Sequence, residues 1–195
     1  MFPQPVIALW TKHPGDLLGE AITFLTHGPA EHAGWIGSDG QTVYECYLPK
    51  ARKRQVLDSE KAFIRLFTLE GMTPEVARSF ERWLSLATDP KFAEEYSVKG
   101  LFGFELNIPP ADEQHCFCSE WDMQSIRQVA PELLPLSRCE DWQTSPVDLL
   151  HSPRLHEISW SDIPKSQPVI SPFVFNEAPV IPITGVTPNL PPKTA

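Results

Sequence analysis

Apolar and polar residues follow two different spacings along this chain. Short apolar or alternating runs, which predict β-strands, lie at residues 6–10, 32–36, 42–47, 55–57, 62–67 and 158–160. Apolar residues three and four positions apart, which predict helices, follow residues 16, 73, 89, 118 and 145. We therefore expect an α+β fold in which a small antiparallel sheet packs on the helix that begins at Cys118.

The strands predicted at 32–36 and 42–47 are joined by Gly-Ser-Asp-Gly, a segment typical of a tight hairpin. If its Asp-Gly pair forms a two-residue turn, Glu45 lies diagonally opposite His32 on the same face of the sheet. If the turn begins one residue earlier, the two side chains face each other directly. Both registers bring imidazole and carboxylate together, whereas a three-residue loop would place them on opposite faces. A core histidine and an unrelated, outward-facing glutamate are the alternative interpretation.

Cys118 lies at the predicted start of a helix, in the segment QHCFCSEW, and prolines upstream prevent an earlier start. Ser119 and Glu120 then fall in the first turn, where hydroxyl and acidic residues are favoured. The N–H groups and dipole of a helix start favour a thiolate and can bind the oxyanion of an acyl-transfer intermediate. We therefore expect a lowered pKa for Cys118 and rapid alkylation at about pH 6. A buried structural cysteine is the alternative. Glu120 either complements the helix dipole or binds a substrate amine.

Length and composition restrict the class of protein. With 195 residues, of which 42% are hydrophobic, the chain is long enough for one domain with a full core. Its formal net charge of −9 argues against a surface that binds nucleic acid. No apolar run approaches the ~18 residues of a transmembrane segment, and no signal peptide is recognisable. We therefore expect a cytoplasmic protein, with non-classical export as the alternative. The acidic balance says little about the substrate, which the cysteine chemistry predicts to be a small peptide or acyl compound.

The four cysteines, at positions 46, 116, 118 and 139, are too few and too unevenly spaced for a disulfide scaffold. A bridge between Cys116 and Cys118 would be strained. A zinc site built from His115 and those two cysteines would lack a second ligand pair at suitable spacing. We therefore expect reduced thiols, with Cys116 serving only in packing, and no metal or cofactor.

Two further segments differ in character from the rest. Arg52-Lys53-Arg54 is a compact basic run, which we interpret as a solvated strand edge that discourages edge-to-edge pairing. Docking of an anionic substrate group is the alternative. From Pro164 onward, eight prolines and sparse charges predict an extended, partly disordered segment. The expected organisation is a folded domain at 1–163 and a proline-rich C-terminal extension at 164–195.

Four short segments resemble one known family. EHAGWI, TVYECY, YSVKGLFGF and FCSEW are similar to motifs of the circularly permuted branch of the NlpC-type papain-like cysteine hydrolases, the YiiX/YebB-like group, which is related to lecithin:retinol acyltransferase-like proteins. The likeness runs from about Pro14 to Leu150. It implies a permuted papain-like catalytic domain with Cys118 as nucleophile, His32 as general base and then acid, and Glu45 as the carboxylate that orients the imidazole. The proline-rich extension departs from the family pattern.

The residues and the resemblance lead to the same hypothesis. Cysteine hydrolysis requires a thiol, a base that takes and returns a proton, and a group that orients the base. We expect a cysteine amidase or endopeptidase that forms an acyl-enzyme on an amide bond, with peptidoglycan-type peptides as one candidate substrate. The first alternative is a thioesterase or acyltransferase for lipid-like acyl groups, with an apolar groove built from residues such as Trp35, Phe102 or Phe104. The second is a non-catalytic binding module.

Overall fold

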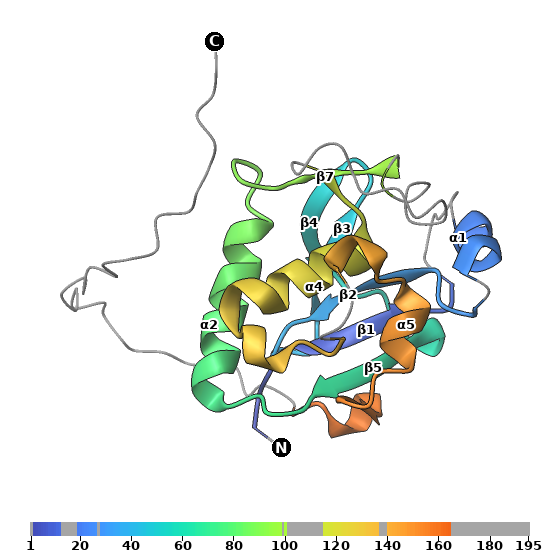
Figure 1. Cartoon of the computed structure of the whole chain (residues 1–195). Coiled ribbons are helices and arrows are strands. Elements are labelled where there is room, and N and C mark those ends of the chain that lie inside the picture. Colours follow the sequence, from blue (N-terminus) through green and yellow to red (C-terminus); the bar gives the residue numbers. More distant parts are fainter. Residues whose placement is uncertain are drawn as a thin grey trace, which may run out of the picture.

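The protein is built around one large β-sheet with helices packed against it (Figure 1). The computed structural model describes residues 2–12, 19–26, 28–98, 100, 115–136 and 140–164. The predictions for the first half of the first helix, for Cys139 and for the extension from residue 165 onward lie outside these residues. The α+β class expected from the sequence is confirmed.

The sheet is larger than expected. In the described residues it has eight strands in the order β7-β6-β4-β3-β2-β1-β5-β8. Neighbours are antiparallel throughout except for β6 and β7, which are parallel. The strands are β1 (Val6–Trp10), β2 (His32–Ile36), β3 (Thr42–Tyr47), β4 (Lys50–Gln55), β5 (Ile64–Leu69), β6 (Glu95–Tyr96), β7 (His115–Cys116) and β8 (Leu155–Ile158).

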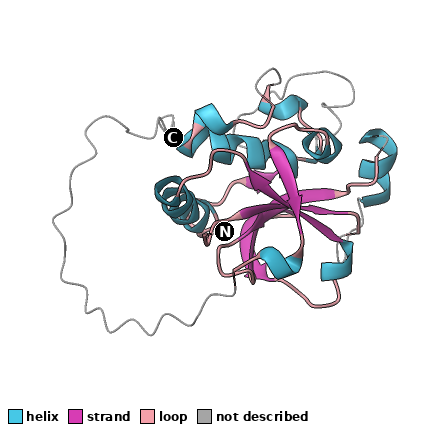
Figure 2. Cartoon of the chain, turned by 90° about the horizontal axis from the view of Figure 1, so that it is seen from below, coloured by secondary structure: helices cyan, strands magenta, loops and turns pink. Residues whose placement is uncertain are grey.

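The two longest helices lie side by side across one face of this sheet, as Figures 1 and 2 show from two directions. α4 packs against β2, β3 and α2. In the part of the chain that the structure describes, the α-helices are α1 (Gly19–Thr26), α2 (Pro74–Ala87), α4 (Cys118–Val129) and α5 (Pro146–Leu150). Short 3-10 helices are η1 (Lys61–Phe63), η2 (Pro131–Leu133), η3 (Asp141–Gln143) and η4 (Trp160–Asp162).

Each face of the sheet buries its own set of apolar side chains, because successive residues of a strand point to opposite faces. The larger core lies under α2 and α4 and includes Leu9, Trp35, Phe80 and Trp121. The smaller core lies on the opposite face and includes Val6, Ala8, Trp10, Ile36 and Ile163. The five residues of β1 are all buried because they alternate between these two cores.

The hairpin predicted to carry His32 and Glu45 is confirmed. In β2 and β3, Trp35 pairs with Tyr44 and Ile36 with Val43, which is the register that sets Glu45 diagonally opposite His32. The connection is longer than the two-residue turn expected, because Gly37 N–H donates to the Thr42 carbonyl at 2.7 Å and closes a loop over residues 38–41. Gly40 in this loop has a φ of 68°, a left-handed conformation that favours glycine.

The predicted starts of helices α2 and α5 are confirmed. Thr73 caps α2 by accepting a hydrogen bond from Val76 N–H at 3.3 Å, and Pro74 occupies the first helical position. Ser145 caps α5 in the same way, accepting from Asp148 N–H at 3.1 Å. In both cases the local capping chemistry specifies the boundary without help from tertiary contacts.

Several strand and helix predictions are wrong. The strand expected at 55–57 is β4, which ends at Gln55, and the strand expected from residue 62 begins at Ile64 after η1. The last strand ends at Ile158, and Trp160 begins η4. No helix follows Asp89 and Pro90: Phe92 N–H closes a single turn on the Asp89 carbonyl at 2.9 Å, and the Phe92 side chain is 60% exposed. A helix there would not be stabilised by packing, because it would bury no apolar face.

Within the described residues, no helix combines the length and apolar character that crossing a bilayer would require.

Substituting two phenylalanines separates the core from the exposed turn. Phe80 is fully buried and its ring centroid lies 4.4 Å from that of Trp35. We expect Phe80→Ala to lower the free energy of unfolding by about 3–5 kcal/mol, through lost burial and a residual cavity. Phe92→Ala, the matched control, should change it by less than about 0.5 kcal/mol. Urea denaturation measures both, and similar losses for the two variants would contradict the assignment of the core.

Candidate functional site

His32 and Glu45 form a buried pair. The His32 Nε2 and Glu45 Oε2 atoms lie 3.1 Å apart, and the two side chains are 1% and 0% exposed. His32 begins β2 and Glu45 lies near the end of β3, so the hairpin register itself brings them onto one face. The imidazole ring is also held by aromatic neighbours, with its centroid 5.1 Å from Trp10 and 5.3 Å from Tyr47. The carboxylate therefore fixes the orientation of an imidazole that has little room to rotate.

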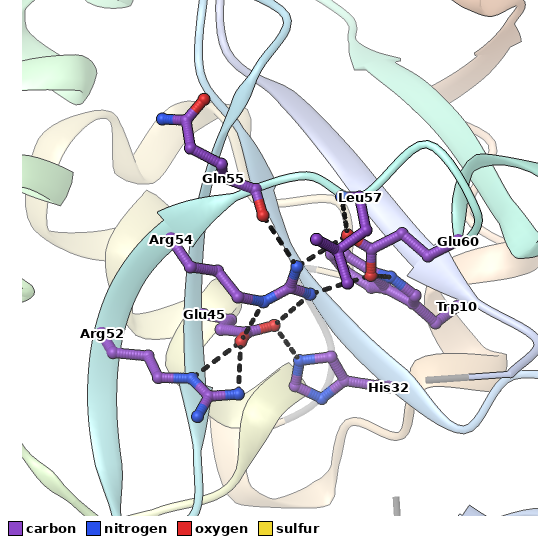
Figure 3. A network of polar contacts seen from close by, with 8 residues as sticks. All are labelled: Trp10, His32, Glu45, Arg52, Arg54, Gln55, Leu57 and Glu60. Atoms are coloured by element: carbon purple, nitrogen blue, oxygen red, sulfur yellow. Dashed lines mark hydrogen bonds and ion pairs between the residues drawn. The ribbon is translucent and has the colours of Figure 1, made fainter. Parts of the chain in front are cut away.

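Glu45 also accepts hydrogen bonds from two arginines of the next strand (Figure 3). Arg52 Nε and Nη2 both lie 2.9 Å from Glu45 Oε1. Arg54 Nε donates to the same oxygen at 2.8 Å, and Arg54 Nη2 lies 3.3 Å from Oε2. A carboxylate with no exposure to water requires such partners, because an unpaired buried charge is strongly destabilising.

Arg54 connects this carboxylate to a second one, Glu60. Arg54 Nη1 and Nη2 donate to Glu60 at 2.6 and 3.0 Å, and Trp10 Nε1 donates to Glu60 Oε2 at 3.1 Å. Burial alone would lower the pKa of Arg54, but the hydrogen bonds with Glu60 and Glu45 raise it above its usual value. Burial likewise opposes ionisation of Glu60, and the bonds from Arg54 and from the Leu57 N–H outweigh it and lower the pKa of Glu60. Arg54 therefore links two carboxylates, Glu45 and Glu60, in one charged network (Figure 3).

This network corrects our interpretation of the basic run. On one side β4 pairs along its whole length with β3, and on the other it pairs with β6 at Lys50, so among the described strands residues 52–54 do lie at an edge, as predicted. The expectation that their side chains are solvated is what the structure changes. The Arg52 and Arg54 side chains are 39% and 20% exposed and point at Glu45, and only Lys53 is an exposed residue. The signal for this was present in the sequence, because residues 52 and 54 share one face of a strand. The missing information was the buried acid that they face.

Cys118 is the first residue of α4, as predicted, and Phe117 is its N-cap. Phe117 N–H donates to Glu120 Oε2 at 3.3 Å, which closes the first turn. Ser119 Oγ donates to the Thr144 carbonyl at 2.6 Å and anchors the helix start to the chain ahead of α5. All of these residues are buried, so the position of the thiol is fixed by packing and by hydrogen bonds on both sides.

The expected low pKa of Cys118 is wrong. Burial raises the pKa of this thiol to about 12, although hydrogen bonds from the backbone N–H groups of Ala33 and Ser119 act in the opposite direction. The negative charge of Asp122, one turn along α4, raises the thiol pKa further. The helix-start effect on which the prediction rested is therefore present, but the loss of hydration around a side chain that is 1% exposed outweighs it.

Two of the three predicted catalytic residues, His32 and Glu45, are in contact, whereas Cys118 lies on the other face of the sheet. Ala33 and Trp35 belong to the same core as Cys118, so His32, with the opposite parity in β2, points to the other face beside Trp10. The thiol reaches β2 at the backbone N–H of Ala33, the residue next to His32. The structure thus joins His32 to Glu45, and it places the thiol of Cys118, from helix α4, beside the backbone of Ala33, the residue after His32. Proton exchange between Cys118 and His32 stays a prediction.

Glu120 is a buried acid at the start of the helix. Its side chain is 5% exposed, and burial raises its pKa to about 7 in spite of the Phe117 N–H bond. Because Glu120 holds that N–H, it caps the helix, and it is too enclosed to support the alternative in which it binds a substrate amine. Among the described residues, no group of three or more His, Cys, Asp or Glu side chains is arranged to hold a metal ion.

Replacing Glu120 by glutamine should stabilise the fold at neutral and alkaline pH. Since the folded-state pKa is about 7 and the ordinary value is 4.5, the folded state favours the protonated acid and loses stability as the pH rises through 7. We expect Glu120→Gln to raise the free energy of unfolding by about 1–3 kcal/mol at pH 8 and to make little difference at pH 4. Urea titrations across that range measure it.

The matched control is Glu75→Gln, which removes an acid from the first turn of α2. Glu75 is exposed and its pKa is lowered by backbone and side-chain hydrogen bonds. This variant should therefore gain no stability at pH 8. A gain of equal size in both variants would indicate a general charge effect and contradict the buried-acid explanation.

Alkylation reports on the Cys118 thiol directly. With a pKa of about 12, only about one thiol in a million is ionised at pH 6. We therefore expect iodoacetamide to modify Cys118 more slowly in the native protein than in the urea-denatured protein at this pH, measured by mass spectrometry of the peptide. Faster reaction in the native state would show that the thiol is activated and that burial does not control it.

The chain matches no protein-family model and has no significant match among curated proteins, so the likeness to permuted NlpC-type hydrolases depends on its short motifs alone.

Proposed function

We propose that this protein is a cysteine hydrolase in which Cys118 attacks an amide carbonyl, His32 transfers the proton and Glu45 orients the imidazole. The observation that carries the proposal is the 3.1 Å contact between His32 and Glu45, buried at the strand that the Cys118 helix packs against. Thiol acyl transfer requires a thiol, a base and a group that orients the base. His32 and Glu45 supply a bonded base and carboxylate, and Cys118 lies beside the same strand at Ala33.

In this proposal, the Cys118 thiol and the His32 imidazole approach each other beyond the last paired residues of β2 and β3. The last residue pair at that end is Trp35 with Tyr44, so His32 and Ala33 extend past it. Burial raises the pKa of Asp122, and the negative charge of Glu45 raises it further, so groups on the two faces are within electrostatic reach here. We infer that Cys118 and His32 meet in this region. Because Nε2 of His32 bonds to Glu45, the proton would move through Nδ1.

The raised thiol pKa determines the type of mechanism. A resting thiolate–imidazolium pair is disfavoured, so His32 would remove the Cys118 proton as the sulfur attacks the carbonyl carbon. The C–N bond would then break as the imidazolium returns this proton to the leaving amine, which yields a thioester on Cys118. Water, deprotonated by His32, would attack the thioester and release the acid and the thiol.

The acyltransferase alternative predicts an apolar groove, and of its three expected lining residues the structure describes Trp35. Trp35 is fully buried against Phe80 and therefore belongs to the core. Phe102 and Phe104 lie outside the described residues. We retain amide hydrolysis as the proposal, with peptidoglycan-type peptides as the first substrate class to test and acyl thioesters as the second.

Adduct formation on Cys118 tests the proposal. The reduced protein is incubated with muropeptide fragments or with acyl thioesters, quenched with acid, and examined by peptide mass spectrometry for an acyl group on Cys118. We expect an adduct from the amide substrates, no adduct in Cys118→Ala, and at least a ~100-fold slower reaction in His32→Ala, because general base catalysis is lost.

Cys116→Ala is the matched control, since it removes a buried thiol two residues away and should retain the adduct. Modification by thioesters alone would favour the acyltransferase alternative. If neither substrate class modifies Cys118 while the protein remains folded, the hydrolase proposal is wrong and a binding module is the better interpretation.

A further inference from the structure

A pair of buried thiols, Cys46 and Cys116, lies next to the candidate site. Cys46 Sγ and Cys116 Sγ are 3.3 Å apart, and Cys46 Sγ also lies 3.5 Å from the Cys116 carbonyl oxygen. Both cysteines are reduced and fully buried. Nothing in the sequence pairs them, because 70 positions separate them, and the sequence predicts only a packing role for Cys116.

The two cysteines are attached to the segments that carry the candidate catalytic residues. Cys46 follows Glu45 in β3, and Cys116 precedes Cys118 by two residues. Any change in the contact between the two sulfurs therefore acts on both the orienting carboxylate and the entry to α4. Cys46 is also close enough to influence the Cys118 pKa.

We propose that Cys46 and Cys116 are an oxidation site, at which a peroxide converts the two thiols into a disulfide that lowers the reactivity of Cys118. One sulfur, as its thiolate, attacks a peroxide oxygen: an S–O bond forms, the O–O bond breaks, and hydroxide leaves and is protonated to water. The second sulfur attacks the resulting sulfenic acid, so an S–S bond forms, the S–O bond breaks and a second water leaves. The peroxide is reduced by two electrons, which the two thiols supply.

The surroundings of Cys46 and Cys116 explain why the two thiols are protected at rest and how an oxidant reaches them. The pKa of Cys116 is raised above its ordinary value by its contact with Cys46 and by burial, which protects the closed pair from oxidants. However, β7 has only two residues and is the last strand in the sheet order, held to β6 by the pairs Glu95–His115 and Tyr96–Cys116. Such a short terminal strand is the kind of element that opens locally at low cost. Oxidation should therefore be slow and set by this opening.

Formation of the disulfide would move the chain next to Cys118. A disulfide brings the sulfurs to about 2.05 Å, so they must approach by more than ~1 Å from their present contact. That shift pulls the chain just before α4 toward β3. Displacements of ~1 Å at a reacting group can reduce a rate by ~100-fold. The effect on activity rests on the proposed function, whereas formation of the disulfide does not.

Non-reducing peptide mapping tests the oxidation site. The folded protein is treated with hydrogen peroxide, remaining thiols are blocked with N-ethylmaleimide under denaturing conditions, and digests are compared with and without dithiothreitol. We expect a Cys46–Cys116 linked peptide, lacking two hydrogen atoms and cleaved by dithiothreitol. Cys46→Ala and Cys116→Ala should each abolish it, and Cys139→Ala, the matched control, should leave it unchanged. Thermal denaturation confirms that each variant is folded.

Two outcomes would overturn the proposal. Oxidation of Cys118 at peroxide doses that leave Cys46 and Cys116 as thiols would show that the pair is not the sensitive site. A link from Cys118 to either cysteine in place of the expected one would show a different disulfide. The rate of acyl-adduct formation on Cys118 in the oxidised protein is a separate readout, expected to fall about 10–100-fold and to recover with dithiothreitol. An unchanged rate would disprove the regulatory effect while leaving the disulfide itself established.

Discussion

The buried carboxylate of Glu45 is the interaction on which the site depends. An ionised acid with no access to water is stable only if charge and hydrogen bonds compensate it, and here Arg52, Arg54 and His32 all do so. The same bonds tie β2, β3 and β4 together on one face of the sheet, and Arg54 extends the network to Glu60. The polar cluster that orients the imidazole is therefore also part of what holds the strands in register. The candidate site and the fold share these contacts, so removal of Glu45 would disturb both.

Hydration, more than the helix dipole, controls the candidate nucleophile. Local chemistry at the start of α4 does act as expected, since backbone N–H groups of Ala33 and Ser119 lower the thiol pKa. The cost of placing a charge in a site without water is larger, and it leaves Cys118 neutral. The same competition keeps Glu120 partly protonated near neutral pH. In the proposed mechanism such a thiol would need a base that removes its proton during attack, so that catalysis would depend on the imidazole of His32 and the carboxylate of Glu45.

Packing on both faces of the sheet gives the site its particular geometry. α4 lies on the face that buries Trp35 and Trp121, and the His32–Glu45 pair lies on the face of Trp10. The last residue pair between β2 and β3 at that end is Trp35 with Tyr44, and the proposed meeting of thiol and imidazole lies beyond it, at His32 and Ala33. The thiol pair of Cys46 and Cys116 lies beside this region and couples it to the short strand β7.

The sequence by itself determined the elements whose cause is local. Capping at Thr73 and Ser145, the start of α4 at Cys118 and the hairpin that pairs His32 with Glu45 all follow from turn chemistry, caps and the two-residue period of a strand. Tertiary structure decided what depends on distant partners. The arginines of β4 required Glu45 to give them a role, the Cys118 pKa required the surrounding core, and the contact of Cys46 with Cys116 required β7 to reach the sheet. Charge burial and long-range contact are properties of the packed chain, because the hydration of a group is set by neighbours far away in sequence.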